Sequence, residues 1–156
     1  HSMAAGLTLA REGLESLGNY LAGSLANDVM HASRSKDLRI DGALMPSAAN
    51  PELLALLDKA GPYGAGNPRP RFAFGAHRCS FAKVVGGAHV RCSLMAGDGS
   101  RIDAVAFRSA DTPLGALLLE AGGMPLHVVG HLRRNQWGGR ESVELVIEDA
   151  APIRQK

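Results

Sequence analysis

The residues best suited to chemistry in this sequence are the basic and aromatic side chains of the stretch RRNQWGGR. It places Trp137, the single tryptophan of the chain, among Arg133, Arg134 and Arg140, and Asn135 adds an amide. A base can stack on an indole ring while guanidinium groups neutralise the adjacent phosphates, as a site for single-stranded nucleic acid requires. The stretch therefore predicts nucleic-acid binding in a loop between two strands. The alternative is that the tryptophan folds back as a hydrophobic plug.

A second set of polar residues lies in the stretch HVRCSL. His89, Arg91 and Ser93 alternate with three apolar residues, which predicts a strand with one face in the core and one basic face outside. Lys83 lies on the strand expected just before it. The residues predicted to contact nucleic acid are Lys83, His89, Arg91, Arg133, Arg134, Asn135, Trp137 and Arg140.

The positive charge of the chain is concentrated in one region. Residues 69–140 contain ten Lys or Arg against four Asp or Glu, whereas the preceding segment has five against seven and the following one two against four. A local excess of this kind is typical of a surface that binds a polyanion. The alternative is a solvated surface that is rich in arginine.

Catalytic motifs are missing from the sequence. The six histidines and fifteen acids are scattered, without HExxH or CxxC spacing, so we expect no metal site and no catalysis by this chain alone. Cys79 and Cys92 match no metal spacing and are expected to be buried free thiols, as in a cytoplasmic protein. Glu148 and Asp149 are expected to be solvated. No apolar stretch is long enough to span a bilayer, so no membrane partner is expected.

The first part of the chain predicts helices around one short strand. Leucines at helical spacing predict a helix over residues 9–27, followed by a loop over 31–37 and a strand over 38–44. A second helix is expected after Asn50, a capping residue, and before Gly61, which should stop it.

The remainder predicts a small barrel. The segment GPYGAGNPRPRF is too rich in glycine and proline for regular structure. Then follow three strands, a helix and two strands, the order of a five-stranded barrel of the oligonucleotide-binding (OB) type. The predicted fold class is therefore α+β. The strands are expected in FAKVV, HVRCSLMA, RIDAVAF, PLHVVGHLRRN and SVELVIEDA, and the helix in TPLGALLLEAG.

Several of these segments together resemble one known family. GAGNPRPRF, HVRCSL, RIDAVAF and LRRNQWGGRESVELVIEDAAPI are similar, in this order over residues 62–153, to the C-terminal part of the RecJ family of bacterial single-strand-specific exonucleases. The family often has an acid where Arg69 stands, so no role is transferred to that position.

The opening HSMAAG resembles the end of the GGHxxAAG signature of the family's DHH-associated domain. In the family, the loop with this signature approaches a phosphate. The alternative is that His1 and Ser2 remain from an expression tag. The matching residues are His1, Ala4, Ala5 and Gly6.

The resemblance implies a division of the chain and a role for it. Residues 1–48 would end a DHH-associated domain, 49–70 would form a connecting helix and loop, and 71–153 would form the OB barrel. The chain is then expected to be the C-terminal part of an exonuclease of DNA repair and recombination, a cytoplasmic monomer that binds single-stranded DNA, with a single-strand binding protein as a candidate partner. Divalent Mn or Mg would belong to a DHH domain outside this chain. The alternatives are a stand-alone oligonucleotide-binding module and a protein-docking barrel with Trp137 as its anchor.

Overall fold

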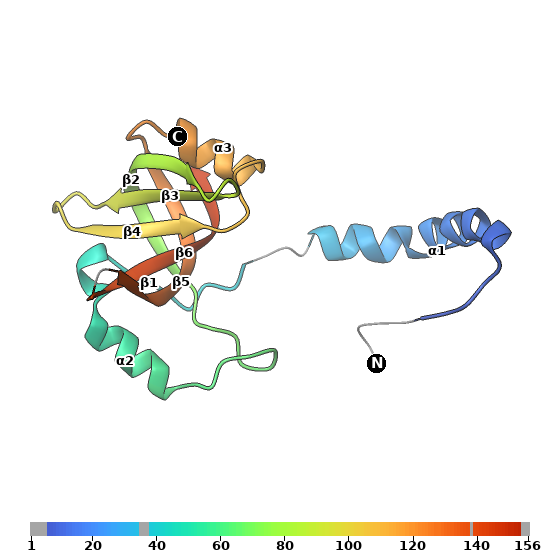
Figure 1. The fold of residues 1–156 in the computed structure, drawn as a ribbon, viewed down its shortest axis with the longest axis horizontal. Coiled ribbons are helices and arrows are strands. Elements are labelled where there is room, and N and C mark those ends of the chain that lie inside the picture. Colours follow the sequence, from blue (N-terminus) through green and yellow to red (C-terminus); the bar gives the residue numbers. More distant parts are fainter. Residues whose placement is uncertain (1–5, 35–37, 138, 154–156) are drawn as a thin grey trace. The chain divides into compact units, whose positions relative to one another are not determined.

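The computed structural model describes residues 6–34, 38–137 and 139–153, without the side chains of residues 31–34, 137 and 140. These residues form two compact units that divide between Leu38 and Arg39. The first unit contains a short 3-10 helix, η1 (Arg11–Gly13), and the long helix α1 (Leu14–Arg34) (Figure 1). The loop predicted from residue 31 is wrong as far as Arg34, because no glycine or proline after Gly23 stops the helix.

The second unit begins with three short elements. They are β1 (Gly42–Ala43), the 3-10 helix η2 (Pro46–Ala48) and α2 (Pro51–Lys59). The strand predicted over 38–44 is thus reduced to two residues, which pair in parallel with the start of β2. The start of α2 is confirmed: the Asn50 side chain accepts a hydrogen bond from the Leu53 amide at 2.9 Å. The domain boundary predicted at residue 48 stays a prediction.

Five further strands close into a barrel. They are β2 (Phe72–Val85), β3 (His89–Met95), β4 (Arg101–Ala106), β5 (Pro125–Trp137) and β6 (Arg140–Pro152), with α3 (Pro113–Glu120) between β4 and β5. The order is β1-β2-β3-β4-β6-β5, and pairing of β2 with β5 closes the barrel. All barrel pairs are antiparallel except β4 with β6. The predicted five-stranded OB barrel and the α+β class are confirmed.

The core fills this barrel and extends to the helices at its ends. In Figure 1, α3 lies at the upper end of the barrel and α2 at the lower end. Leu118 of α3 and Leu54 of α2 are buried in the same core as the strand residues. The alternation predicted for β3 is confirmed, since Val90, Cys92 and Leu94 are buried and the residues between them are half-buried. Both cysteines are buried and free.

Strand β2 is longer and more bent than predicted. It begins at residue 72 rather than 81, and its register shifts between Phe74 and His77 and again between Ser80 and Lys83. Such bulges break the alternation of apolar and polar residues by which a strand is found in a sequence. The first half of β2 was missed for this reason.

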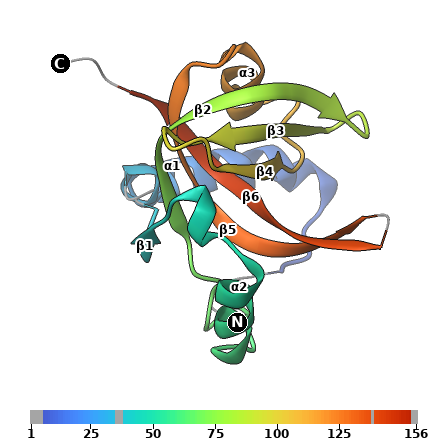
Figure 2. The same ribbon diagram turned by 90° about the vertical axis from the view of Figure 1, so that its left-hand side faces the viewer.

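The β5–β6 hairpin also differs from the prediction. Its strands run to Trp137 and from Arg140, so most of the stretch predicted as a loop is strand (Figure 2). Successive side chains of a strand point to opposite faces. Arg133 and Arg134 therefore cannot act together on one face, as a loop would have allowed.

Candidate nucleic-acid interface

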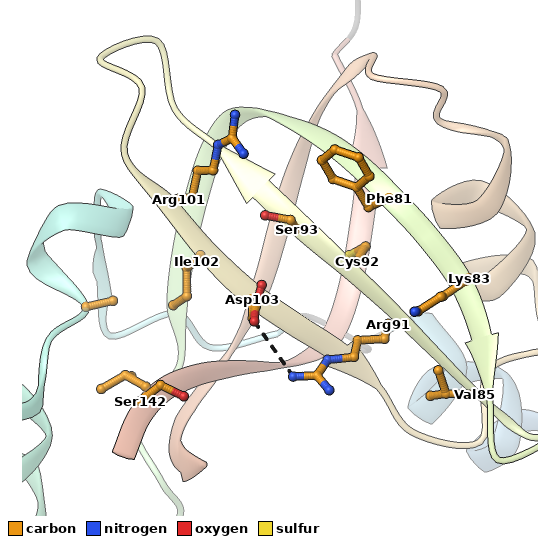
Figure 3. Close-up of a pocket in the computed structure, with 12 residues that line it drawn as sticks. Phe81, Lys83, Val85, Arg91, Cys92, Ser93, Arg101, Ile102, Asp103 and Ser142 are labelled. Carbon is orange, nitrogen blue, oxygen red and sulfur yellow. Dashed lines mark ion pairs between the residues drawn. The ribbon is translucent and has the colours of Figure 1, made fainter. Parts of the chain in front are cut away.

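A groove of about 820 Å³ lies over strands β2, β3 and β4 (Figure 3). Each strand contributes one basic residue to it: Lys83 from β2, Arg91 from β3 and Arg101 from β4. The only acid that lines it among the described residues is Asp103. The groove thus offers three cations on the face that OB barrels use to bind oligonucleotides. Its remaining lining residues are Ala49, Phe81, Val85, Cys92, Ser93, Ile102, Ser142 and Val143.

Arg91 is held in place by two carboxylates. Its Nη2 lies 3.7 Å from Asp103 Oδ2 and 3.3 Å from Glu144 Oε1. Glu144 also accepts hydrogen bonds from Arg133, at 2.8 Å from Nε and 2.6 Å from Nη2. The Glu144 side chain is 2% exposed, whereas those of the two arginines are 41% and 40% exposed. One buried carboxylate therefore orients two guanidinium groups from different strands and leaves both accessible to solvent.

Phe107 links the same cluster to His89. The guanidinium carbon of Arg133 lies 4.7 Å from the centre of the Phe107 ring, a cation–π contact, and the His89 ring packs edge-on against it at 5.1 Å. His89 Nδ1 accepts a hydrogen bond from the Arg108 amide at 2.9 Å, so its other ring nitrogen carries the proton. His89, Arg91 and Arg133, three of the predicted residues, are thus brought together through Glu144 and Phe107.

The other predicted residues on the hairpin do not join this cluster. Arg134 is on the opposite face, where it pairs with Glu141 and, at 3.2 Å, with Asp58 of α2. Asn135 is half-buried, and its backbone carbonyl accepts a hydrogen bond from the Ser142 hydroxyl at 3.5 Å. The side chains of Trp137 and Arg140 lie outside the described part; the two residues pair through the backbone. Among the residues predicted to approach a phosphate, Gly6 is exposed, and His1, Ala4 and Ala5 lie outside the described residues.

A second charged cluster surrounds Glu148 beside the Gly/Pro-rich loop. Its carboxylate lies 2.5 Å from Arg71 Nε and 2.9 Å from His131 Nδ1. Burial raises the pKa of Glu148, but the hydrogen bonds and charges of His131 and Arg71 outweigh it and hold the pKa below its ordinary value of 4.5. The expectation that Glu148 is solvated was wrong, because folding brings Arg71, 77 positions away, against it. Asp149 is exposed as expected.

Four residues of this surface were missed in the sequence. Arg101 could have been found, because it occupies an outward position of a strand whose alternation is clear. Phe107 and Glu144 could not have been found, because their roles depend on contacts with arginines of other strands, which the sequence does not reveal. Phe81, which is 77% exposed, lies at a bulge where alternation gives no guide.

Within residues 6–34, 38–137 and 139–153, no group of three or more His, Cys, Asp or Glu is placed to hold a metal ion. No helix in the same part of the chain combines the length and the apolarity needed to cross a membrane.

Hydrogen bonding to Cys79 and burial raise the pKa of the Cys92 thiol, which makes it a poor nucleophile.

The closed barrel and its basic groove define an oligonucleotide-binding-fold domain. Residues 40–149 match the RecJ OB domain family, and the chain belongs to this family. It is 30% identical over 155 residues to the single-stranded-DNA-specific exonuclease RecJ of Escherichia coli K12, covering 98% of this chain and 26% of that protein. The RecJ of Bacillus subtilis 168 is 25% identical over 153 residues, which are 97% of this chain and 19% of that protein.

The fold is also similar to a solved RecJ structure. The crystal structure of RecJ in complex with Mn2+ from Thermus thermophilus superimposes with a TM-score of 0.54 at 24% identity, over 88% of this chain and 20% of that one. The chain therefore spans about a quarter or less of the length of the relatives it matches.

Proposed function

We propose that this chain is the C-terminal single-stranded-DNA-binding part of a RecJ-like exonuclease that hydrolyses phosphodiester bonds in DNA repair and recombination. The observation that carries the proposal is the groove with Lys83, Arg91 and Arg101 on the ligand-binding face of an OB barrel. Membership of the RecJ OB domain family supports it, as do relatives named single-stranded-DNA-specific exonucleases.

The groove would bind the sugar–phosphate backbone through charge. Arg91 and Asp103 are separated by 3.7 Å, a loose pair that a phosphate can replace at small cost because both side chains are largely exposed. Arg133 would serve as a fixed cation beside the groove, since Glu144 and Phe107 hold its guanidinium from two sides. Asn135, Trp137 and Arg140 would extend the path along the β5–β6 hairpin, with the indole as a stacking platform.

The remaining features of the proposal concern the larger protein. Hydrolysis would take place in a DHH domain outside this chain, where Mn or Mg would activate water and neutralise charge on the reacting phosphate. Residues 1–48 would belong to the DHH-associated domain, with His1, Ala4, Ala5 and Gly6 in its phosphate-facing loop. The chain alone would be an inactive monomer. The whole protein would work in the cytoplasm, with a single-strand binding protein as a partner.

The test is the salt dependence of binding to a labelled oligothymidylate, measured by fluorescence anisotropy. The affinity should fall steeply with salt, and Lys83→Ala or Arg91→Ala should each lower it and reduce the slope of log affinity against log salt by about 0.7. Arg39→Ala is the matched control, because this arginine has a 90% exposed side chain and does not line the groove. Affinity that is independent of salt would exclude the proposal and favour a protein-docking barrel.

A further inference from the structure

Phe81 combines two properties that are rare in a large apolar residue. Its side chain is 77% exposed, the most exposed of the described large hydrophobic residues. Its backbone is in the left-handed region, at φ 55°, where a bulky side chain is strained. Strain of this kind persists only where the surrounding structure imposes it, and it is concentrated at functional sites.

The bulge in β2 explains how Phe81 comes to face the groove. Ser80 pairs with Ser93 and Lys83 with Arg91, so two residues of β2 oppose Cys92 alone. Cys79 points into the core, and an unbroken strand would send residue 81 inward as well. The extra residue shifts the alternation: Ala82 packs against the core, and Phe81 is turned out.

The ring lies within the basic groove. Phe81 and Arg101 lie on either side of Ser93 at one end of the groove, and Lys83 lies further along the same strand (Figure 3). No aromatic or cation–π contact among the described residues involves the Phe81 ring. An open aromatic face next to cations is the arrangement on which a base stacks while its phosphates are neutralised.

We propose that Phe81 is a base-stacking residue for single-stranded DNA, held in the groove by the bulge of β2, with Lys83 and Arg101 binding the phosphates on either side of the stacked nucleotide. The inference rests on the proposed function and assigns to it a site that does not depend on Trp137. The bulge places the Phe81 backbone in a strained conformation and turns its ring out toward the ligand.

Phe81→Gly tests this directly, because glycine adopts a positive φ without strain. The thermal midpoint of the variant should stay within a few degrees of the unaltered chain or rise, while its affinity for oligothymidylate should fall about 5- to 100-fold, as expected for one lost base stack. Phe81→Trp should retain the affinity. If the glycine variant proves unstable, Phe81→Asn serves the same purpose, because asparagine also tolerates this backbone region.

An abasic oligonucleotide separates stacking from other roles. The unaltered chain and Phe81→Gly should bind it equally, and the salt slope should not change, because the ring carries no charge. Val84→Ala, which removes an exposed side chain of the same strand outside the groove, should bind both oligonucleotides normally.

The outcomes distinguish this inference from the proposed function. If the unaltered chain binds DNA with a steep salt dependence and Phe81→Gly binds equally well, the stacking role is excluded and the proposed function stands. Equal losses on normal and abasic DNA would also exclude stacking. If the unaltered chain binds no DNA, both proposals fail.

Discussion

At the scale of single residues, Glu144 holds Arg91 and Arg133, two of the residues proposed to contact phosphate. A buried carboxylate that accepts hydrogen bonds from two guanidinium groups fixes their positions and also offsets part of their charge. Together with Asp103, which pairs with Arg91, the two arginines and Glu144 form a cluster with no net charge. The sequence does not show that these acids lie against the arginines, so the proposed attraction for DNA should be weaker than the number of arginines alone indicates.

Glu144→Gln should separate these two effects. The substitution keeps the shape of the side chain but removes its charge, so the weaker hydrogen bonds to the arginines should lower the free energy of unfolding by about 1–3 kcal/mol. The affinity for single-stranded DNA should rise, with a steeper salt slope, because a carboxylate no longer competes with phosphate. Urea unfolding and anisotropy titrations measure the two changes.

Asp149→Asn is the control for this substitution. It removes the same charge from the same strand, at an exposed position that makes none of the described ion pairs, so it should change affinity and stability little. Lower DNA affinity of a stable Glu144→Gln protein would show that the carboxylate helps binding and does not compete with phosphate.

At the scale of elements, the arrangement of β5 and β6 depends on a close approach of their backbones at Gly130. A Cβ atom at this position would lie 2.0 Å from the carbonyl oxygen of Val146, and the register of the pair shifts between Val129 and Gly130. Only glycine fits without movement of the strands. The same two strands position His131, Arg133 and Glu144, so the geometry of the charged clusters depends on this contact.

Gly130→Ala should destabilise the barrel by about 1–3 kcal/mol, the usual cost of forcing an extra carbon atom into a packed site. Urea unfolding followed by circular dichroism measures this loss. Gly97→Ala is the matched control, because a Cβ there meets no atom within 4 Å, and its effect should stay within about 0.5 kcal/mol. Equal stability of the two variants would show that β5 and β6 can separate at this point without cost.

At the scale of the whole molecule, the barrel has a core of its own. All buried members of that core lie between Ala49 and Ile147. A chain of residues 39–156 should therefore fold alone, with a thermal midpoint within a few degrees of that of the intact chain and with equal affinity for single-stranded DNA. Calorimetry and anisotropy test this; a barrel that fails to fold without residues 1–38 would contradict the division into two units.

The sequence predicted the parts of the fold that depend on local patterns. The cap at Asn50, the alternation of β3 and the place of α3 in the strand order follow from neighbouring residues. The two strands of the β5–β6 hairpin were predicted, but their extension to Trp137 and from Arg140 was not. Glycine and polar residues near the turn have weak strand preference, and pairing across the hairpin outweighs it. The clusters around Glu144 and Glu148 depend on residues brought together by barrel closure, which no local pattern encodes.

The closing ladder between β2 and β5 also has a consequence for synthesis of the protein. Phe72 pairs with Gly130 and Phe74 with Val128, so the barrel cannot close until β5 has left the ribosome. Until then β2, β3 and β4 can pair only with one another, and the outer edges of such a sheet would lack most of their final partners. Unpaired edges of this kind can pair with other chains, and contacts between distant residues form slowly. We therefore expect the nascent chain to be most prone to aggregation during translation of the segment between β4 and the end of β6.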